Sequence, residues 1–202
     1  MRHITITQMA HHLIDINVTA ESICADLTAG NGNDTLYLAK KAKHVYAFDI
    51  QAQAIENTKE KVKEYTNVTC ILDSHVKVKD YIQETLDFAI FNFGYLPKGD
   101  KNITTMKETS LQAVQNVLDI LHPQGLLCLC FYPGHEEGAK EKDYVLDYLL
   151  KQDQLLLSHY HTLQPFAPEL YLISKRKEKQ LWNQLSELPQ DTLKKTAGAK
   201  NI

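Results

Sequence analysis

The stretch Asp26-Leu-Thr-Ala-Gly30-Asn-Gly32-Asn33-Asp34-Thr35 decides the fold. It follows the short apolar run 22–25 and leads into the helix-like run 35–40, so it predicts a strand, a tight turn and a helix start. Gly30 and Gly32 permit a sharp turn and a close approach to a ligand, because neither residue carries a Cβ atom. The stretch therefore predicts the ligand-binding corner of an α/β fold.

The charges in this turn discriminate between cofactors. A nicotinamide fingerprint would place a third glycine where Thr35 stands, and no Gly-Lys-Ser/Thr follows, which excludes a P-loop. Asp26 and Asp34 would repel a pyrophosphate, whereas S-adenosylmethionine has no phosphate, a cationic sulfur and a zwitterionic amino acid end. We therefore predict S-adenosylmethionine as the cofactor. The residues of this stretch expected to bind it are Asp26, Thr28, Gly30, Asn31, Gly32, Asn33 and Thr35.

A second acidic residue follows the next strand-like run. The run 44–48 ends at Asp49, about twenty residues past the glycine turn, where a ribose-binding acid is expected in such βαβ units. Gln51 would then reach the sugar or the adenine edge. The alternative is that Asp49 caps the helix that opens behind it, and both roles are compatible.

A third run, 67–72, ends in Asp73, Ser74 and His75. Ligands of such folds bind at the carboxyl ends of the strands, so these side chains should share an edge with the two acids above. Asp73 or Ser74 is expected to bind the adenine amino group, and His75 to pack on the ring. For His75, a satisfied surface histidine is an equally weighted alternative.

The fourth run, 86–91, leads into Asn92-Phe-Gly-Tyr95-Leu-Pro97, which resembles the Asn-Pro-Pro-Tyr loop of amino-group methyltransferases. A methyl-accepting nitrogen needs its lone pair aimed at the sulfonium carbon, and an Asn oxygen can accept the nitrogen's hydrogens and orient it. Tyr95 can stack on a planar base. Asn92 is also expected to contact the cofactor. The alternative is that Asn92 caps a turn and Tyr95 is a core aromatic.

The order of these motifs resembles class I S-adenosylmethionine-dependent methyltransferases. More narrowly, the blocks 26–35, 49–51, 73–75, 92–101 and 131–135 are similar to one small bacterial group long labelled rRNA methylases. The resemblance implies methylation of the aminomethyl arm on the wobble uridine of tRNA, giving 5-methylaminomethyl-2-thiouridine. It covers residues 1–176 and implies the tRNA anticodon region as partner, which composition and spacing do not show.

Two further segments are expected to meet the acceptor. Tyr132 and His135 follow the run 125–131 and would cover the base by stacking or contact it, unless this loop is a plain strand-to-helix turn. Lys98 and Lys101 adjoin the acceptor loop as a basic patch. An alkylamine is protonated at neutral pH, so His135 or a water near Asn92 is expected to take its proton. The predicted catalytic residues are thus Asn92, Tyr95 and His135.

The chain of 202 residues has an ordinary globular composition, with 44% hydrophobic and 23% charged residues. Seven apolar runs predict strands, and they are 22–26, 44–49, 67–72, 86–92, 125–131, 155–161 and 170–175. Helical patterns separate most of them, and they are 34–42, 52–65, 104–121 and 138–152. Residues 3–18 are predicted to form an N-terminal amphipathic helix or lid. We expect a Rossmann-like class I methyltransferase fold: an α/β, seven-stranded, mostly parallel sheet with one antiparallel edge strand and helices on both faces. Residues 1–176 form this domain, and residues 177–202 a polar C-terminal extension.

Composition also bounds location and partners. No apolar run approaches the roughly twenty residues that cross a bilayer, so a cytoplasmic protein without membrane contact is expected. The net charge of -3 argues mildly against bulk nucleic-acid binding but does not exclude RNA. Four cysteines lie in apolar runs as small hydrophobes, and the histidines have no metal-like spacing, so no metal is predicted.

Three other functions stay open: an rRNA or other nucleic-acid base methyltransferase, a small-molecule amine methyltransferase, and a noncatalytic RNA-binding protein that retains the fold. The sequence leaves the oligomeric state open, with a homodimer among the options.

Overall fold

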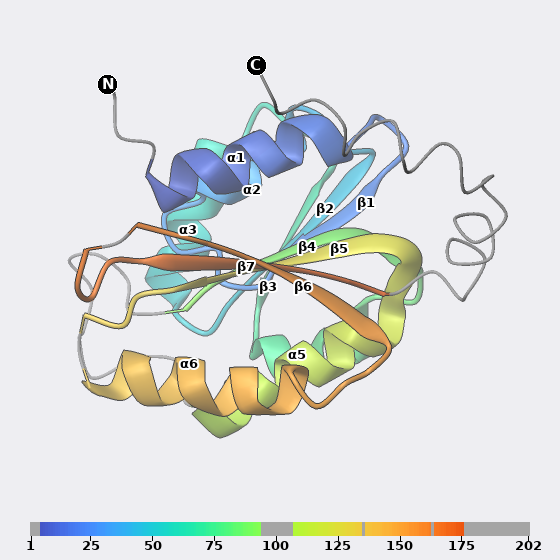
Figure 1. The fold of residues 1–202 in the computed structure, drawn as a ribbon. Helices are drawn as coiled ribbons and strands as arrows, with labels where there is room; N and C mark the ends of the chain where they lie inside the picture. Colours follow the sequence, from blue (N-terminus) through green and yellow to red (C-terminus); the bar gives the residue numbers. More distant parts are fainter. Residues whose placement is uncertain (1–4, 94–106, 135, 163, 176–202) are drawn as a thin grey trace, which may run out of the picture.

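The computed structural model describes residues 5–93, 107–134, 136–162 and 164–175, and its centre is one seven-stranded sheet (Figure 1). The strands are β1 (Ile23–Asp26), β2 (His44–Asp49), β3 (Val68–Leu72), β4 (Leu86–Asn92), β5 (Leu121–Phe131), β6 (Leu155–His161) and β7 (Glu169–Lys175). Their order is β3-β2-β1-β4-β5-β7-β6, and β1 to β5 pair in parallel. The carboxyl ends of these five strands therefore meet at one edge of the sheet, as the sequence predicts.

Helices cover both faces of the sheet (Figure 1). They are α1 (Ile6–Asn17), α2 (Asn33–Ala39), α3 (Ala52–Lys61), the 3-10 turn η1 (His75–Lys77), α4 (Val78–Tyr81), α5 (Lys107–Ile120) and α6 (Glu136–Leu149). Helices α1 and α2 lie together on one face, and α5 and α6 on the other. The predicted Rossmann-like α/β class is confirmed.

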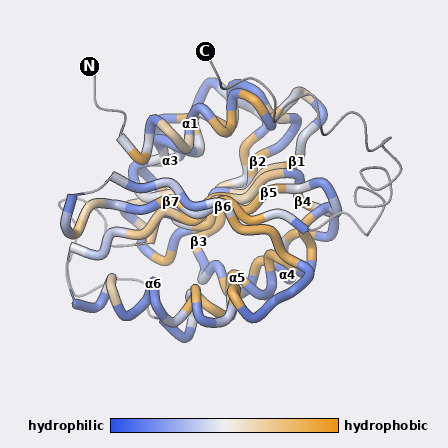
Figure 2. The backbone as a smooth tube through the Cα atoms, viewed as in Figure 1, coloured by the Kyte–Doolittle hydropathy of each residue, from blue (hydrophilic) through white to orange (hydrophobic). Residues whose placement is uncertain are grey.

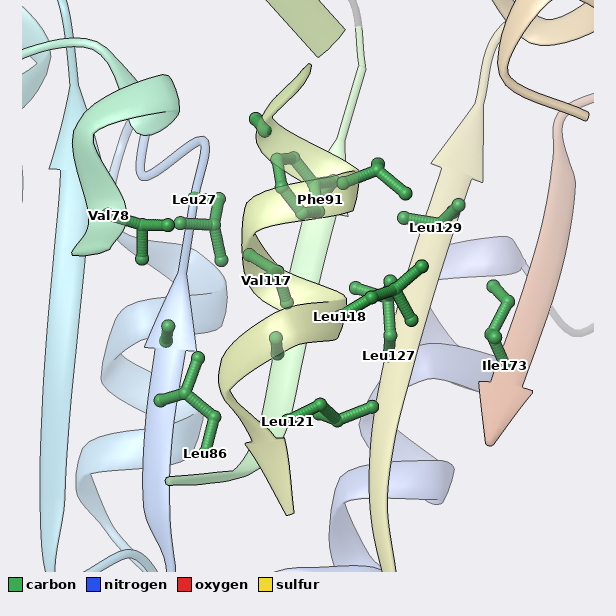
Figure 3. Close-up of a cluster of buried hydrophobic side chains, with 14 of the residues drawn as sticks. Leu27, Val78, Leu86, Phe91, Val117, Leu118, Leu121, Leu127, Leu129 and Ile173 are labelled. Atoms are coloured by element: carbon green, nitrogen blue, oxygen red, sulfur yellow. The ribbon is translucent and has the colours of Figure 1, made fainter. Parts of the chain in front are cut away.

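Strand β4 shows why the sheet carries a core on each face. Its residues alternate, so that Phe88 and Ile90 face α1 and α2 while Ala89 and Phe91 face α5. Figure 3 shows Val117 and Leu118 of α5 pointing at the side chains of β4 and β5. The tube coloured by hydropathy is accordingly apolar along the central strands and polar on the outer helical surfaces (Figure 2). Burial on both faces explains why the central strands read as nearly continuous apolar runs.

The edge hairpin follows from the short link 162–168, which is too short for a crossover helix. Strand β7 runs antiparallel to both β5 and β6, and β6 is the outermost strand. Two rings of β6, His159 and His161, lie on one face of the strand and stack, with centroids 4.5 Å apart. Nε2 of His159 lies 2.8 Å from a carboxylate oxygen of Glu169, which belongs to the neighbouring strand β7.

The structure differs from the sequence prediction at several element boundaries and in two short elements. Strand β5 begins at Leu121, four residues before the expected start at residue 125, and Leu121 pairs with Leu86 before a register shift. The short elements η1 and α4 have no counterpart in the prediction, because seven residues show too little periodicity. The extension 177–202 lies outside the described residues. Among the helices described, none is long and apolar enough to cross a membrane.

Candidate active site

Asp26 stabilises the glycine turn between β1 and α2 through hydrogen bonds. Its carboxylate accepts hydrogen bonds from the Thr28 N–H (3.2 Å) and the Thr35 hydroxyl (2.6 Å). Asp26 is only 1% exposed. Burial, reinforced by the charge of Asp34, raises the pKa of Asp26 to about 7. Asp26 therefore stabilises the turn. Thr35 stands where a nicotinamide fingerprint has its third glycine, and its hydroxyl donates the hydrogen bond to Asp26.

Both glycines of the predicted sharp turn have a left-handed backbone, with φ of 54° at Gly30 and 71° at Gly32. A Cβ atom on Gly32 would lie 2.9 Å from the Thr58 Cα of α3, so this position requires glycine for space as well. The amide oxygens of Asn31 and Asn33 accept hydrogen bonds from Asn57 and Lys61 of α3. The turn is thus packed closely against α3.

Asp49 lies at the end of β2, beside the turn. Its two oxygens accept the backbone N–H groups of Gly30 and Gln51, each at 2.9 Å. The N-cap of α3 is Gln51, which makes no side-chain capping bond, so Asp49 does not occupy the capping position. Each carboxylate oxygen keeps a further lone pair for a ribose hydroxyl. The adjoining Ile50 is an exposed apolar residue, with 54% of its surface accessible.

The three predicted adenine contacts after β3 are engaged in local structure. Asp73 accepts hydrogen bonds from the Tyr81 hydroxyl (2.8 Å) and the Ser74 N–H (2.7 Å), and the Tyr81 bond contributes most to its lowered pKa. Ser74 caps η1. His75 is a buried residue rather than a surface one, and its Nδ1 lies 3.1 Å from the Leu27 carbonyl oxygen. A carbonyl only accepts, so Nδ1 donates, and burial lowers the pKa of His75.

Asn92, at the end of β4, is the centre of a hydrogen-bond network. Its backbone N–H donates to the Thr28 hydroxyl at 2.7 Å. Its side-chain nitrogen donates to Asp34 at 2.5 Å, and its side-chain oxygen accepts from the Tyr132 hydroxyl at 3.2 Å. Asp34 in turn lies 2.7 Å from Nε2 of His11. Residues from α1, α2, β4 and the end of β5 therefore meet at the carboxyl edge of the sheet.

Two members of this network were not predicted as site residues, namely His11 and Asp34. The sequence signal that indicates them is the polar spacing on the facing sides of the two helices α1 and α2. His11 and Asp15 lie four residues apart on α1. Asp15 accepts a hydrogen bond from Tyr37 of α2 and forms an ion pair with Lys41, which follows α2. Helices α1 and α2 are thereby docked through polar contacts beside the glycine turn.

The acceptor side is described in part. Tyr132 is half-buried, and its hydroxyl donates a hydrogen bond to Asn92. Its ring packs against the core cluster on the α1 side of the sheet. Phe93 is buried between Phe91 and Phe131, with ring centroids 5.0 and 4.8 Å away, and anchors the start of the acceptor loop. The other predicted acceptor residues lie outside the described residues, and they are Tyr95, Lys98, Lys101 and His135.

Comparison with known proteins agrees with this geometry. The family model described as "Putative rRNA methylase" matches residues 45–174. The chain is 33% identical to the chloroplastic tRNA (mnm5s2U34)-methyltransferase of Arabidopsis thaliana over 84% of this chain and 69% of that protein. A Clostridium thermocellum protein of the same description as the family superposes with a TM-score of 0.82 at 32% identity, covering 87% of this chain and all of the other (100%).

A Streptococcus mutans relative supplies the ligand chemistry. Its crystal structure, in complex with S-adenosylhomocysteine, has a TM-score of 0.79 and 37% identity, and the match covers 87% of this chain and 99% of that one. The prediction of S-adenosylmethionine as cofactor is confirmed at the level of the family. The described carboxylates and glycine turn fit that cofactor, because no phosphate has to be accommodated beside Asp34 and Asp49. On fold, motif order and sequence identity, the chain belongs to the rRNA methylase family of S-adenosylmethionine-dependent methyltransferases.

Proposed function

We propose that this protein methylates the aminomethyl nitrogen of 5-aminomethyl-2-thiouridine at the wobble position of tRNA, giving 5-methylaminomethyl-2-thiouridine. The substrate is supported by the name of the Arabidopsis relative, which shares a third of the aligned residues over most of this chain. The acceptor chemistry is supported by Asn92, and this is the observation that carries the proposal.

Asn92 suits an amine acceptor because its amide is fixed from both sides. Asp34 accepts from the side-chain nitrogen and Tyr132 donates to the side-chain oxygen. The oxygen keeps a second lone pair, which can accept a hydrogen of the acceptor amine. Orientation of the nucleophile is the main contribution that the protein makes to such a transfer.

When bound, S-adenosylmethionine supplies a methyl group on a positive sulfur, which the neutral amine takes up with release of S-adenosylhomocysteine and one proton. We assign cofactor binding to the glycine turn, and ribose binding to Asp49. Tyr95 stacks on the base, Lys98 and Lys101 meet the anticodon backbone, and His135 receives the proton. These four residues complete the proposal from the sequence.

The test uses tRNA that carries 5-aminomethyl-2-thiouridine, the purified protein and S-adenosylmethionine. Nucleoside mass spectrometry should show conversion to 5-methylaminomethyl-2-thiouridine, and a strain without the protein should accumulate the unmethylated nucleoside. The variant Asn92→Ala should bind S-adenosylmethionine in calorimetry yet lose most, though not all, of its methyl transfer. Unchanged nucleosides in the deletion strain would show that the tRNA substrate is wrong.

An rRNA substrate is the second candidate. It is favoured by the family description and by a relative from Acholeplasma laidlawii named ribosomal RNA small subunit methyltransferase H 1, 27% identical over 69% of this chain and 52% of that protein. The same assay with ribosomal RNA separates the two. Absence of S-adenosylmethionine binding would instead select a noncatalytic RNA-binding protein.

A further inference from the structure

Asp34 has both carboxylate oxygens engaged, although it stands beside the acceptor residue. One oxygen lies 2.7 Å from Nε2 of His11, and the other accepts from the Asn92 side-chain nitrogen at 2.5 Å. The Asp34 side chain is 12% exposed, so these bonds form largely out of solvent. A charged acceptor in such a setting makes stronger hydrogen bonds than a neutral one.

The chemistry of these partners determines which way the Asn92 amide faces. A carboxylate only accepts, so the amide nitrogen must face Asp34 and the amide oxygen must face Tyr132. Tyr132 is a donor here, since burial raises the pKa of its hydroxyl to about 12. The donors and acceptors are thus consistent with one amide orientation, the one that presents an oxygen to an amine.

Helix α1 holds Asp34 in turn. The His11 ring stacks on the Tyr37 ring with centroids 3.9 Å apart and planes 12° apart. The Tyr37 hydroxyl is itself bound to Asp15 at 2.9 Å. Because its ring is clamped in this way, His11 directs Nε2 at Asp34, and a hydrogen bond between them requires Nε2 to donate to the carboxylate.

We propose that Asp34, held by His11 of α1, is a positioning residue for the methyl acceptor: it orients the Asn92 amide so that its oxygen faces the amine. The proposal rests on the proposed amine methylation. It makes α1 a wall of the active site, because His11 binds the Asp34 oxygen that Asn92 does not bind.

The kinetic test is a double-mutant cycle on Asp34→Asn and Asn92→Ala. Asp34→Asn should lower kcat by roughly 10- to 100-fold, since a small misplacement of a reacting group costs about that much. The rates are compared at saturating S-adenosylmethionine, so that a change in cofactor affinity on removal of the Asp34 charge does not enter kcat. In the Asn92→Ala background the same change should cost almost nothing more. Losses that multiply would overturn the proposal.

Two neighbouring histidines of α1 provide a matched pair. His11→Ala should lower kcat in the same direction as Asp34→Asn, whereas His12→Ala should leave kcat unchanged, because His12 is exposed on the same helix. Equal effects of the two variants would assign the loss to helix stability and contradict the positioning role.

A substrate-free measurement separates this proposal from the proposed function. Nitrogen-15 NMR of the free wild-type protein should show the His11 ring proton on Nε2. Both the His11 ring signals and the Asn92 side-chain amide signal should shift in Asp34→Asn. Unchanged signals for both residues would overturn the network itself. If the network is present but the wild-type protein leaves the tRNA unmethylated, the assigned substrate is wrong and the amide orientation stands.

Discussion

Asp49 is the residue whose single replacement tests the cofactor site most directly. It binds the backbone of the turn through Gly30 and that of α3 through Gln51, and it keeps free lone pairs for the ribose. Asp49→Ala should weaken S-adenosylmethionine binding roughly tenfold or more, because hydrogen bonds to a charged group are worth about 1.5–3 kcal/mol. Calorimetry measures this, with the exposed Asp80 replaced as the control. Unchanged affinity would contradict the ribose role.

Other single residues show where sequence reasoning stops. Strand-end carboxylates such as Asp26 and Asp49 could be found, because charge after an apolar run is a local signal. The partner of His75 could not, since it bonds to the Leu27 carbonyl 48 residues away. His11 was missed because its partner, Asp34, belongs to another helix. The sequence signal for it is the polar spacing of His11 and Asp15 on one face of α1, which does not name the partner.

At the scale of elements, the junction of the turn with α2 and α3 depends on Gly32. Gly32→Ala should reduce the free energy of unfolding by roughly 1–2 kcal/mol for the left-handed backbone alone, with more from the contact with Thr58. Gly134→Ala is the matched control, since the nearest atom to its added Cβ is 3.9 Å away and its φ is not positive. Denaturant unfolding compares the two variants, and an equal loss in both would refute the argument.

Elements were predictable where their pattern was long. The helices α5 and α6 and the strands β2 and β4 repeat apolar positions over enough residues to be recognised. The early start of β5 could not be read, because Pro123 and Gly125 indicate a loop locally, while pairing of Leu121 with Leu86 extends the strand. Tertiary pairing overrode the local signal there.

For the whole molecule, Asp26 makes stability depend on pH. Its pKa in the folded protein is about 7 against an ordinary 3.8, so between these values the folded state binds more protons than the unfolded state. The contribution of Asp26 to stability is therefore complete below about pH 4, falls as pH rises, and is lost once pH passes about 7. Asp26→Asn should flatten this dependence, as measured by unfolding from pH 4 to 8. An identical pH slope in the variant would show that Asp26 does not cause it.

The place of β7 between β5 and β6 has a consequence for how the chain is completed during synthesis. β6 leaves the ribosome before β7, although β7 is its partner in the described sheet. The edge of β5 that faces away from β4 also pairs with β7. Until residue 175 has emerged, β6 lacks its hydrogen-bonding partner and one edge of β5 is unpaired. Such exposed backbone groups on largely apolar strands are sites for aberrant association. Strand β7, the last of the described sheet in chain order, is thus the one that joins β6 to β5.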